Sequence, residues 1–306
     1  MDGKQTNLSV VLAVFNEEAN LKECLESVKD IAQEIVIVDG GSTDKTVEIA
    51  ETFGAKIIKT DNPPIFHINK QKALDAATGE WVLQLDADER VSHELAEEII
   101  KVVSSKKADL ENHSVDPTKY DLLIRHLTQL EERDGSVGTK DGPIVAFYLP
   151  RRNYFLGKFL MHGGAYPDGT VRLVKKGKAH FALKEVHDQM IIDGQISVLS
   201  SDLIHMADPT FSRYLQRSNR YTSLQAQEWL DNFQKKPGAK SNFAPGTDIF
   251  SLFKWMFYIP SKTFFSLYFR HKGFMDGFAG LVWAIYSALH IRTSYVKYWE
   301  MRNQNS

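Results

Sequence analysis

The sequence predicts an α/β protein built on a mostly parallel sheet with helices on its faces. Its first hundred residues alternate short β-branched apolar runs with segments of helical periodicity, the pattern typical of strands joined by crossover helices. The ligands of such sheets bind at the carboxyl ends of the strands, so the residues after each strand are the first candidates for a site. The expected strands are 8–14, 35–38, 55–58 and 81–85, and the expected helices are 19–28, 45–53, 69–77 and 93–103.

The composition of the chain changes at residue 104 and again near residue 235. Residues 104–142 are polar and are expected to form a loop-rich insertion with one short helix at 122–130. Further on, strands are expected at 144–149, 170–174 and 196–199, and a polar helix at 211–232. These features predict one domain over residues 1–234, a Pro/Gly/Lys-containing linker over 235–248 and an aromatic helical region over 249–306.

Charge is distributed unevenly along the 306 residues. The formal net charge of −2 gives no overall attraction to nucleic acid, and 43% hydrophobic with 25% charged residues is an ordinary globular composition. Residues 249–306 contain seven Lys or Arg and two acids, a net charge of +5, so the residues before them carry −7. The C-terminal region is therefore expected to present a different surface.

Cys24 is the single cysteine, which excludes an internal disulfide and a Cys-based zinc cluster. We expect it to be a small core residue of the first helix. The N-terminus shows no charged-then-apolar leader, so the catalytic part is expected to stay in the cytosol.

An acidic residue and a glycine turn follow the second expected strand. Asp39 is followed by Gly40-Gly41 and by the helix-capping residues of the Ser-Thr-Asp run at 42–44. A carboxylate in this position can accept hydrogen bonds from a ribose or a base, and glycine lets a ligand approach the backbone. A well-capped turn is the other interpretation, so this motif alone leaves the choice open.

Three carboxylates follow the fourth expected strand within four residues: Asp86, Asp88 and Glu89. Clustered carboxylates repel one another unless a divalent cation or another positive partner neutralises them. A metal that bridges these acids to a diphosphate is one explanation, and an ordinary acidic turn is the other.

Four ordered motifs resemble the family 2 glycosyltransferases with the GT-A fold. They are Val-Val-Leu-Ala-Val-Phe-Asn-Glu-Glu at 10–18, Val-Asp-Gly-Gly-Ser-Thr-Asp at 38–44, Ala-Thr-Gly-Glu-Trp-Val at 77–82 and Asp-Ala-Asp at 86–88. The resemblance implies a GT-A domain with a donor-binding half at 1–103, the insertion at 104–142 and an acceptor half at 143–234. It implies a nucleotide-diphosphate sugar, UDP-hexose in particular, as the donor.

The resemblance also implies roles for the donor-side residues. Asp39 and the Asn16-Glu17 turn would hold the nucleoside, Asp86 would lie near the ribose, and Asp88 would ligate a divalent metal, Mn²⁺ or Mg²⁺. Many members have Arg-Asn where this chain has Lys70-Gln71. Lys70 is therefore expected at a phosphate as a point charge, without the bidentate geometry of arginine.

Beyond the donor half, the chain resembles the bacterial lipopolysaccharide-core glucosyltransferases of the WaaE/KdtX type. The subgroup usually has His-Glu where this chain has His187-Asp188, which keeps the carboxylate and shortens its reach. The matching residues are Gly157, His162-Gly163-Gly164, Tyr166-Pro167-Asp168, Val171-Arg172-Leu173, Val186-His187-Asp188, His205 and Asn219-Arg220-Tyr221.

An inverting transfer needs a base for the acceptor hydroxyl and positive charge for the leaving diphosphate. Asp188 is the expected base, Arg172 joins Lys70 as a diphosphate contact, and His205 joins Asp88 at the metal. The acceptor side is assigned to His162, Gly163, Gly164 and His187. Each assignment has a structural alternative: a surface acid for Asp188, structural roles for the histidines, a salt-bridge partner for Arg172 and a tight loop for the His-Gly-Gly run.

The C-terminal region is expected to associate with a membrane. It holds sixteen of the 34 aromatic residues, interleaved with basic residues, which is typical of helices in a membrane interface. Its longest stretch without a charged residue, 277–291, is fifteen residues, short of the ~20 that a spanning helix needs. We therefore expect peripheral attachment to the inner face of the plasma membrane, where a lipid-linked or lipopolysaccharide-core glycan would be the acceptor. A helical hairpin that covers a core, or a dimer face, is the alternative.

Two other functions are the alternatives to sugar transfer. A sugar-phosphate nucleotidyltransferase would need a Gly-rich, Arg-containing loop after the first strand, where this chain has Phe15-Asn16-Glu17-Glu18. A non-catalytic, membrane-docked protein that binds a nucleotide sugar would share the same motifs, and only turnover would separate the two. A homo-oligomer is also possible.

Overall fold

The structure is a computed structural model, and it describes residues 7–63, 65–105, 121, 123–126, 128–129, 131, 135, 137–181, 190–234 and 244–304. The chain divides into two compact units. The first unit consists of residues 1–152 and 167–206, and the second of residues 153–166 and 207–306. The helix at 211–234 thus groups with the C-terminal helices, whereas the sequence division placed it in the first domain.

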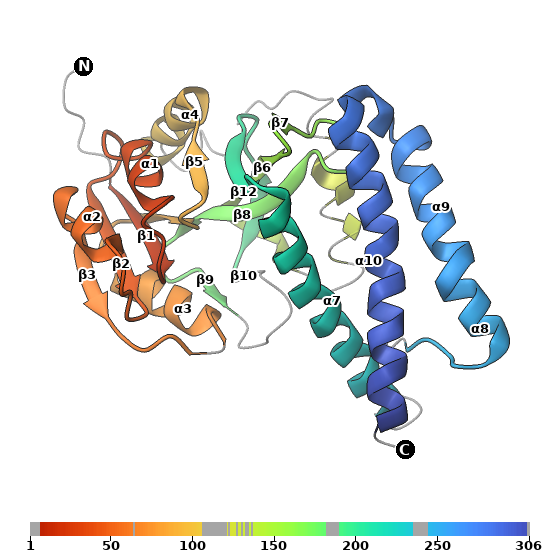
Figure 1. Cartoon of the computed structure of the whole chain (residues 1–306). Coiled ribbons are helices and arrows are strands. Elements are labelled where there is room, and N and C mark those ends of the chain that lie inside the picture. The colour runs from red at the N-terminus through yellow and green to blue at the C-terminus, as the bar shows by residue number, and fades with distance from the viewer. Residues whose placement is uncertain are drawn as a thin grey trace. The chain divides into compact units, whose positions relative to one another are not determined.

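The expected α/β class is confirmed (Figure 1). Helices α1 (Leu21–Glu26), α2 (Thr46–Thr52), α3 (His67–Ala76) and α4 (His93–Val103) alternate with the first strands. Two strands, β6 and β12, continue from the first unit into the second. The strands of this part of the chain are β1 (Leu8–Val14), β2 (Glu34–Asp39), β3 (Lys56–Lys59), β4 (Trp81–Leu85), β5 (Glu89–Val91), β6 (Thr139–Phe155), β8 (Asp168–Lys175), β9 (Ala179–Phe181), β10 (Met190–Ile192), β11 (Gln195–Val198) and β12 (Leu203–Asp208).

Strands β3, β2, β1 and β4 lie side by side and are parallel, which brings their carboxyl ends to one edge. Beyond β4 the sheet continues through β8 and β6, each antiparallel to its neighbour. In the β1–β2 register Val14 lies opposite Asp39, and in the β1–β4 register Leu12 lies opposite Leu85. The residues that follow Val14, Asp39 and Leu85 therefore leave the sheet at the same edge, as the sequence predicted.

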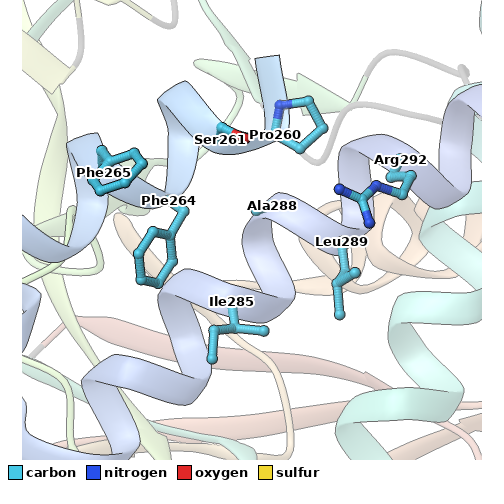
Figure 2. A pocket seen from close by; sticks show the side chains of 8 residues that line it. All are labelled: Pro260, Ser261, Phe264, Phe265, Ile285, Ala288, Leu289 and Arg292. Atoms are coloured by element: carbon cyan, nitrogen blue, oxygen red, sulfur yellow. The ribbon is translucent and has the colours of Figure 1, made fainter. Parts of the chain in front are cut away.

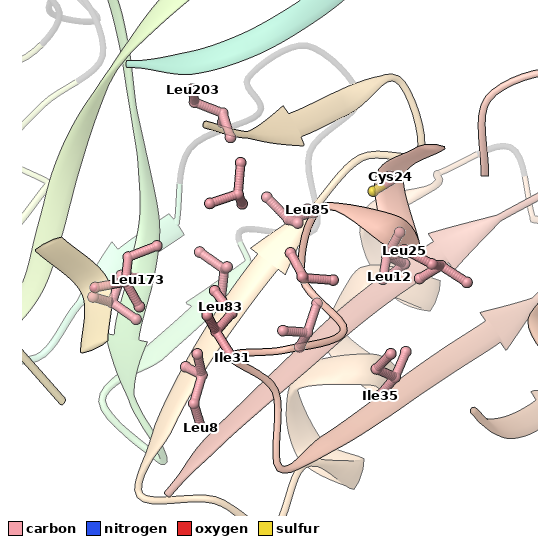
Figure 3. Close-up of a cluster of buried hydrophobic side chains, with 14 of the residues drawn as sticks. Leu8, Leu12, Cys24, Leu25, Ile31, Ile35, Leu83, Leu85, Leu173 and Leu203 are labelled. Carbon is pink, nitrogen blue, oxygen red and sulfur yellow. The ribbon is translucent and has the colours of Figure 1, made fainter. Parts of the chain in front are cut away.

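The parallel strands are buried on both faces, which explains their continuous apolar sequence. Leu8 and Leu12 of β1 pack on one face with Cys24 and Leu25 of α1 (Figure 3). Alternate residues point to the opposite face, where Val11 packs in a second cluster with Ala73 and Leu74 of α3. Cys24 is a core residue, as expected, and burial raises the pKa of its thiol.

The second unit is mainly helical. Helix α10 packs along both α7 and α9 (Figure 1). Nζ of Lys297 on α10 donates to the backbone oxygen of Asn219 on α7 (2.7 Å). Trp229, Tyr295 and Tyr298 form an apolar cluster between these two helices. The elements are β7 (Lys158–Phe159), α7 (Phe211–Gln234), α8 (Ile249–Phe253), η1 (Lys254–Tyr258), α9 (Ile259–Phe265), η2 (Ser266–Arg270), η3 (Gly273–Asp276) and α10 (Gly277–Gln304).

The sequence did not anticipate the short strands β5, β7, β9 and β10, which have two or three residues each, or the six-residue strand β12. Runs this short show no period, so only pairing with a distant strand defines them. Strand β6 also begins earlier than expected, at Thr139, inside the segment assigned to the polar insertion. The described residues 123–126 of that insertion are helical, as expected.

Among the residues that the structure describes, one helical stretch, Gly273–Gln304, is long and apolar enough to cross a membrane by length and composition. Its best 18-residue window has a mean hydropathy of 1.3, and 28% of that window is buried within the protein. The core helix of a soluble protein can satisfy the same criterion. An apolar C-terminal helix is thus present, and whether it lies on or enters a bilayer stays a prediction.

Candidate active site

Asp39 lies at the carboxyl end of β2 with its side chain turned into its own loop. The residue is 2% exposed, and its carboxylate accepts hydrogen bonds from the backbone nitrogens of Gly41 (3.1 Å) and Ser42 (3.2 Å). Gly41 has a φ of +87°, a conformation that strains any residue with a Cβ. An ionised carboxylate has about four lone-pair sites, so Asp39 retains acceptor capacity for a ribose or a base.

The Asn16-Glu17 turn is joined to the loop after β2. Asn16 has a φ of +54°, which asparagine tolerates better than most residues, and its Oδ1 accepts from the backbone nitrogen of Thr43 (2.8 Å). The backbone nitrogen of Glu17 donates to Oγ1 of Thr46 (2.7 Å). These bonds fix the two loops against each other beside Asp39. Asn16 therefore shapes the site, and direct contacts of Asn16 and Glu17 with a donor remain predictions.

Lys70, Asp86 and Arg172 are brought together at the end of β4. Nζ of Lys70 lies 2.7 Å from Oδ1 of Asp86, and Nη2 of Arg172 lies 2.6 Å from Oδ2. Both cations are buried, at 4% and 1% exposed, whereas the Asp86 side chain keeps 26% exposure. Burial alone would raise the pKa of Asp86, but Arg172 and then Lys70 outweigh it and hold that pKa well below its usual range. Asp86 is thus ionised and neutralised by protein cations.

A second carboxylate, Glu89, lies beneath this group and is 0% exposed. Its Oε1 accepts from Nη2 of Arg172 (2.8 Å) and from Nη1 of Arg151 (3.2 Å). Its Oε2 accepts from the backbone nitrogen of Asp86 (2.9 Å). Arg151 in turn pairs with Asp168 at 2.7 Å. Glu89 therefore fixes both the backbone of the Asp86 turn and the guanidinium that holds the Asp86 side chain.

Glu89 and Arg151 were not among the predicted site residues. The signal that pointed to Glu89 was its place in the acidic run, and its partners lie 62 and 83 residues away in the sequence. The salt-bridge role stated as the alternative for Arg172 is visible in these contacts. Contacts of Lys70 and Arg172 with a diphosphate remain predictions.

Asp88 and His205 approach each other, as their shared assignment requires. Nε2 of His205 lies 3.5 Å from Oδ2 of Asp88, and the backbone nitrogen of Met206 donates to the backbone oxygen of Asp88 (2.8 Å). The side chain of His205 is 12% exposed and that of Asp88 is 18% exposed. The pairing of β12 with β5 produces this contact, because His205 lies opposite Glu89 in the register.

A divalent metal would receive two ligands from this pair. In the described part of the chain, no three His, Cys, Asp or Glu residues lie together as a metal site. Mg²⁺ and similar hard cations are usually held by one or two carboxylates, with substrate phosphates and water completing the shell. Asp88 with His205 fits a metal that binds together with a diphosphate, and does not fit a closed structural site.

The predicted acceptor-side loop lies in the second unit. Nδ1 of His162 is 3.0 Å from Oδ1 of Asp276, which is 4% exposed and accepts from the backbone nitrogen of His162 (2.8 Å) through Oδ2. Gly163 and Gly164 have φ values of +65° and +70°. Nε1 of Trp283 donates to the backbone oxygen of Gly163 (3.2 Å). The run forms a tight loop held against η3 and α10, and its contact with an acceptor is a prediction.

The predicted base, Asp188, and its neighbour His187 lie outside the described residues. Their roles therefore rest on the subgroup resemblance.

The comparison with known families decides the class of the protein. The model of the family described as "Glycosyl transferase family 2" matches residues 9–177, more than half of the chain. The chain belongs to glycosyl transferase family 2. The α/β fold with its mostly parallel central sheet is GT-A-like, as the resemblance implied. The family segment contains every donor-side candidate from Asn16 to Arg172, whereas Asp188 and His205 lie beyond it.

Curated relatives cover most of this family 2 chain. It is similar to the lipopolysaccharide core biosynthesis glycosyltransferase LpsC of Rhizobium meliloti, with 26% identity over 93% of this chain and 91% of that protein. It is also similar to an uncharacterized glycosyltransferase of Rickettsia typhi, with 27% identity over 90% of this chain and 80% of the relative.

Solved structures resemble the chain at lower identity. A mannosyltransferase from Pyrobaculum calidifontis in complex with GDP-Man and Mn²⁺ has 13% identity and a TM-score of 0.49, covering 96% of this chain and 87% of its own. A glucosyl-3-phosphoglycerate synthase from Mycobacterium tuberculosis with Mn²⁺, UDP and glucosyl-3-phosphoglycerate has 15% identity and a TM-score of 0.39, covering 72% and 78%.

Proposed function

We propose that this protein is an inverting glycosyltransferase that transfers a hexose from a UDP-sugar to a lipid-linked or lipopolysaccharide-core glycan. The observation that carries the proposal is the position of Asp39, Asp86 and Asp88. All three lie at the carboxyl edge of the parallel sheet, within the segment matched by the family model. The similarity to LpsC over 93% of this chain supports a core-type acceptor. The subgroup like the WaaE/KdtX enzymes is proposed from the matching residues of the sequence alone.

In this mechanism the donor is held first by its nucleoside. Asp39 accepts hydrogen bonds from the base or ribose, with Glu17 beside it. Asp86, kept ionised by Lys70 and Arg172, accepts from a ribose hydroxyl on its exposed side. Asp88 and His205 would hold Mn²⁺ or Mg²⁺, which supplies positive charge to the leaving diphosphate when bound. Asp188 removes the proton of the acceptor hydroxyl as that oxygen attacks the anomeric carbon, and the bond from that carbon to the β-phosphate oxygen breaks so that UDP leaves.

A donor screen tests this function. With Mn²⁺ and a membrane extract that supplies acceptors, we expect release of UDP from one UDP-hexose and little release from GDP-sugars. The control omits the extract, because transfer needs the acceptor and slow hydrolysis does not. Activity with no nucleotide sugar would contradict the proposal and favour the non-catalytic alternative. Release of pyrophosphate from a nucleoside triphosphate and a sugar phosphate would favour the nucleotidyltransferase.

We also propose that the second unit attaches the enzyme to the inner face of the plasma membrane, where a lipid-linked acceptor presents its hydroxyl. Support comes from large apolar side chains that are well exposed on α8 and α10: Phe250 at 84%, Phe253 at 62% and Phe278 at 76%. Basic residues accompany them, and an apolar face with a basic border is typical of an interfacial helix.

Serine at both Phe250 and Phe253 should reduce the membrane-bound fraction. Each exposed aromatic side chain that no longer enters the interface loses part of its apolar transfer energy, about 25 cal/mol per Å². Sedimentation with phosphatidylglycerol-containing vesicles measures the effect, and Ile191→Ser, an exposed apolar residue of β10, is the matched control. Equal binding of both variants would show that α8 does not contact the bilayer.

A further inference from the structure

A groove in the second unit runs between α9 and α10 (Figure 2). Its volume is about 230 Å³, and Arg292 lies at one end. The lining is otherwise mainly apolar and comes from both helices: Pro260, Phe264, Phe265, Ile285, Ala288 and Leu289. The groove therefore combines a hydrophobic channel with one permanent positive charge.

The guanidinium of Arg292 is oriented by its surroundings. Its Nε donates to the backbone oxygen of Met256 (2.9 Å), and its Cζ lies 5.9 Å from the centroid of the Phe257 ring. No carboxylate pairs with Arg292 within the described residues. The bond from Nε leaves the two terminal nitrogens as donors for an anion. Arginine presents these in a planar fork that matches phosphate oxygens.

The size of the groove limits its ligand. A pocket that encloses a whole drug-sized molecule is about 300–1,000 Å³, so a smaller groove holds only part of a ligand, such as a segment of an acyl chain. Two aromatic side chains of this region are well exposed: Phe265 of the lining at 59%, and Phe257, which neighbours Arg292, at 51%. The net charge of +5 over residues 249–306 favours an anionic partner. An apolar chain joined to a phosphate satisfies all of these features.

We propose that the groove between α9 and α10 is a binding site for an anionic phospholipid of the bilayer, with its phosphate at Arg292 and one acyl chain along Phe264 and Ile285. The site deepens the proposed membrane attachment and rests on it. The proposed site adds a preference for an anionic lipid headgroup, which attachment through exposed side chains alone does not give. It does not depend on sugar transfer.

Short-chain lipids test the site without a membrane. Calorimetric titration of the full chain with dihexanoyl-phosphatidylglycerol, below the concentration at which that lipid forms micelles, should show saturable binding. Dihexanoyl-phosphatidylcholine should bind more weakly, because its zwitterionic headgroup cancels the phosphate charge. Inorganic phosphate alone should not bind measurably, because it lacks the chain.

Matched variants assign the binding to the groove. Arg292→Gln should lower the affinity for dihexanoyl-phosphatidylglycerol by about tenfold. Arg270→Gln removes the same charge from an exposed residue of η2 outside the groove lining and should leave the affinity unchanged. Ile285→Asn should lower the affinity for both short-chain lipids by the same factor, because it makes the apolar lining polar and keeps the charge of Arg292. Thermal unfolding of each variant confirms that it is folded.

Three outcomes would overturn the site. Equal losses in Arg292→Gln and Arg270→Gln would show diffuse charge attraction, and binding of inorganic phosphate at similar affinity would show an anion site without a lipid channel. If the short-chain lipids did not bind while the protein still sedimented with vesicles, the groove would not be a lipid-binding site. The proposed membrane attachment would then be unaffected. UDP release by the same preparations reports separately on the proposed transferase function.

Discussion

Replacement of Arg172 with methionine is expected to lower the free energy of unfolding by about 3 kcal/mol. Arg172 is 1% exposed and contacts Asp86 and Glu89, and Glu89 is fully buried. Removal of one partner from a buried ion pair leaves the other charge uncompensated, which typically costs about 3–5 kcal/mol. Lys70 still contacts Asp86 and Arg151 still contacts Glu89, so we expect the lower end of that range. Urea unfolding at pH 7 measures the change.

The pH dependence of the free energy of unfolding tests whether the ion pairs of Asp86 stabilise the fold. The pKa of Asp86 is depressed in the folded protein, so its ion pairs stabilise fully above its unfolded value of about 4 and lose their effect as the pH falls through the folded value. The contribution of these ion pairs to the stability of the wild type should therefore be constant from pH 7 to about pH 4 and fall only in stronger acid, which urea unfolding of the wild type across this range measures.

Lys178→Met is the control for this prediction. The Lys178–Asp193 pair is 2.7 Å long, but its side chains are 44% and 72% exposed. Loss of this exposed pair should lower the free energy of unfolding far less than Arg172→Met does, because water and salt screen the two charges. If Arg172→Met and Lys178→Met were equally stable, the buried network would not hold the turn at the end of β4.

Replacement of Asp88 with asparagine should lower turnover by about 100- to 1,000-fold, the range found when one group that stabilises transition-state charge is removed. Asparagine keeps the size of the side chain and removes the negative charge that a metal ligand needs. The loss should appear in kcat as well as in KM, because the charge on the diphosphate increases as the sugar leaves. Initial rates of UDP release across a range of Mn²⁺ concentrations measure both.

Asp193→Asn is the matched control, because Asp193 carries the same carboxylate at an exposed turn of the first unit. Its turnover should equal that of the wild type. An Asp88→Asn enzyme with unchanged turnover would remove Asp88 from the mechanism, whatever role Asp86 plays.

The sequence predicted the donor half well because its signals are local. Strands β1 and β4 were predicted with their observed bounds, since a run of buried β-branched and aliphatic residues between turns is enough to define a central strand. The shared edge of Asp39 and Asp86 followed from the parallel topology alone. Family membership followed from four motifs that retain their order within ninety residues.

The remaining features are non-local. Asp276 lies 114 residues from His162, and no pattern near the His-Gly-Gly run indicates that a buried carboxylate will hold its imidazole. In the sequence Glu89 likewise looks like another acid of a polar turn. Its burial could not be predicted, because it depends on arginines from β6 and β8. The same acidic run thus contains a structural carboxylate, Glu89, beside the proposed ligand-binding ones, and only tertiary contacts separate them.

The central claim is that acids at the ends of the parallel strands hold a nucleoside diphosphate together with a divalent metal. Calorimetric titration of UDP into the wild type and Asp88→Asn, each with Mn²⁺ and with EDTA, tests this most directly. We expect Mn²⁺ to increase the affinity of the wild type at least about tenfold, a gain of ~1.4 kcal/mol, and to have little effect on Asp88→Asn. Equal affinity for UDP with Mn²⁺ and with EDTA in the wild type would contradict the account.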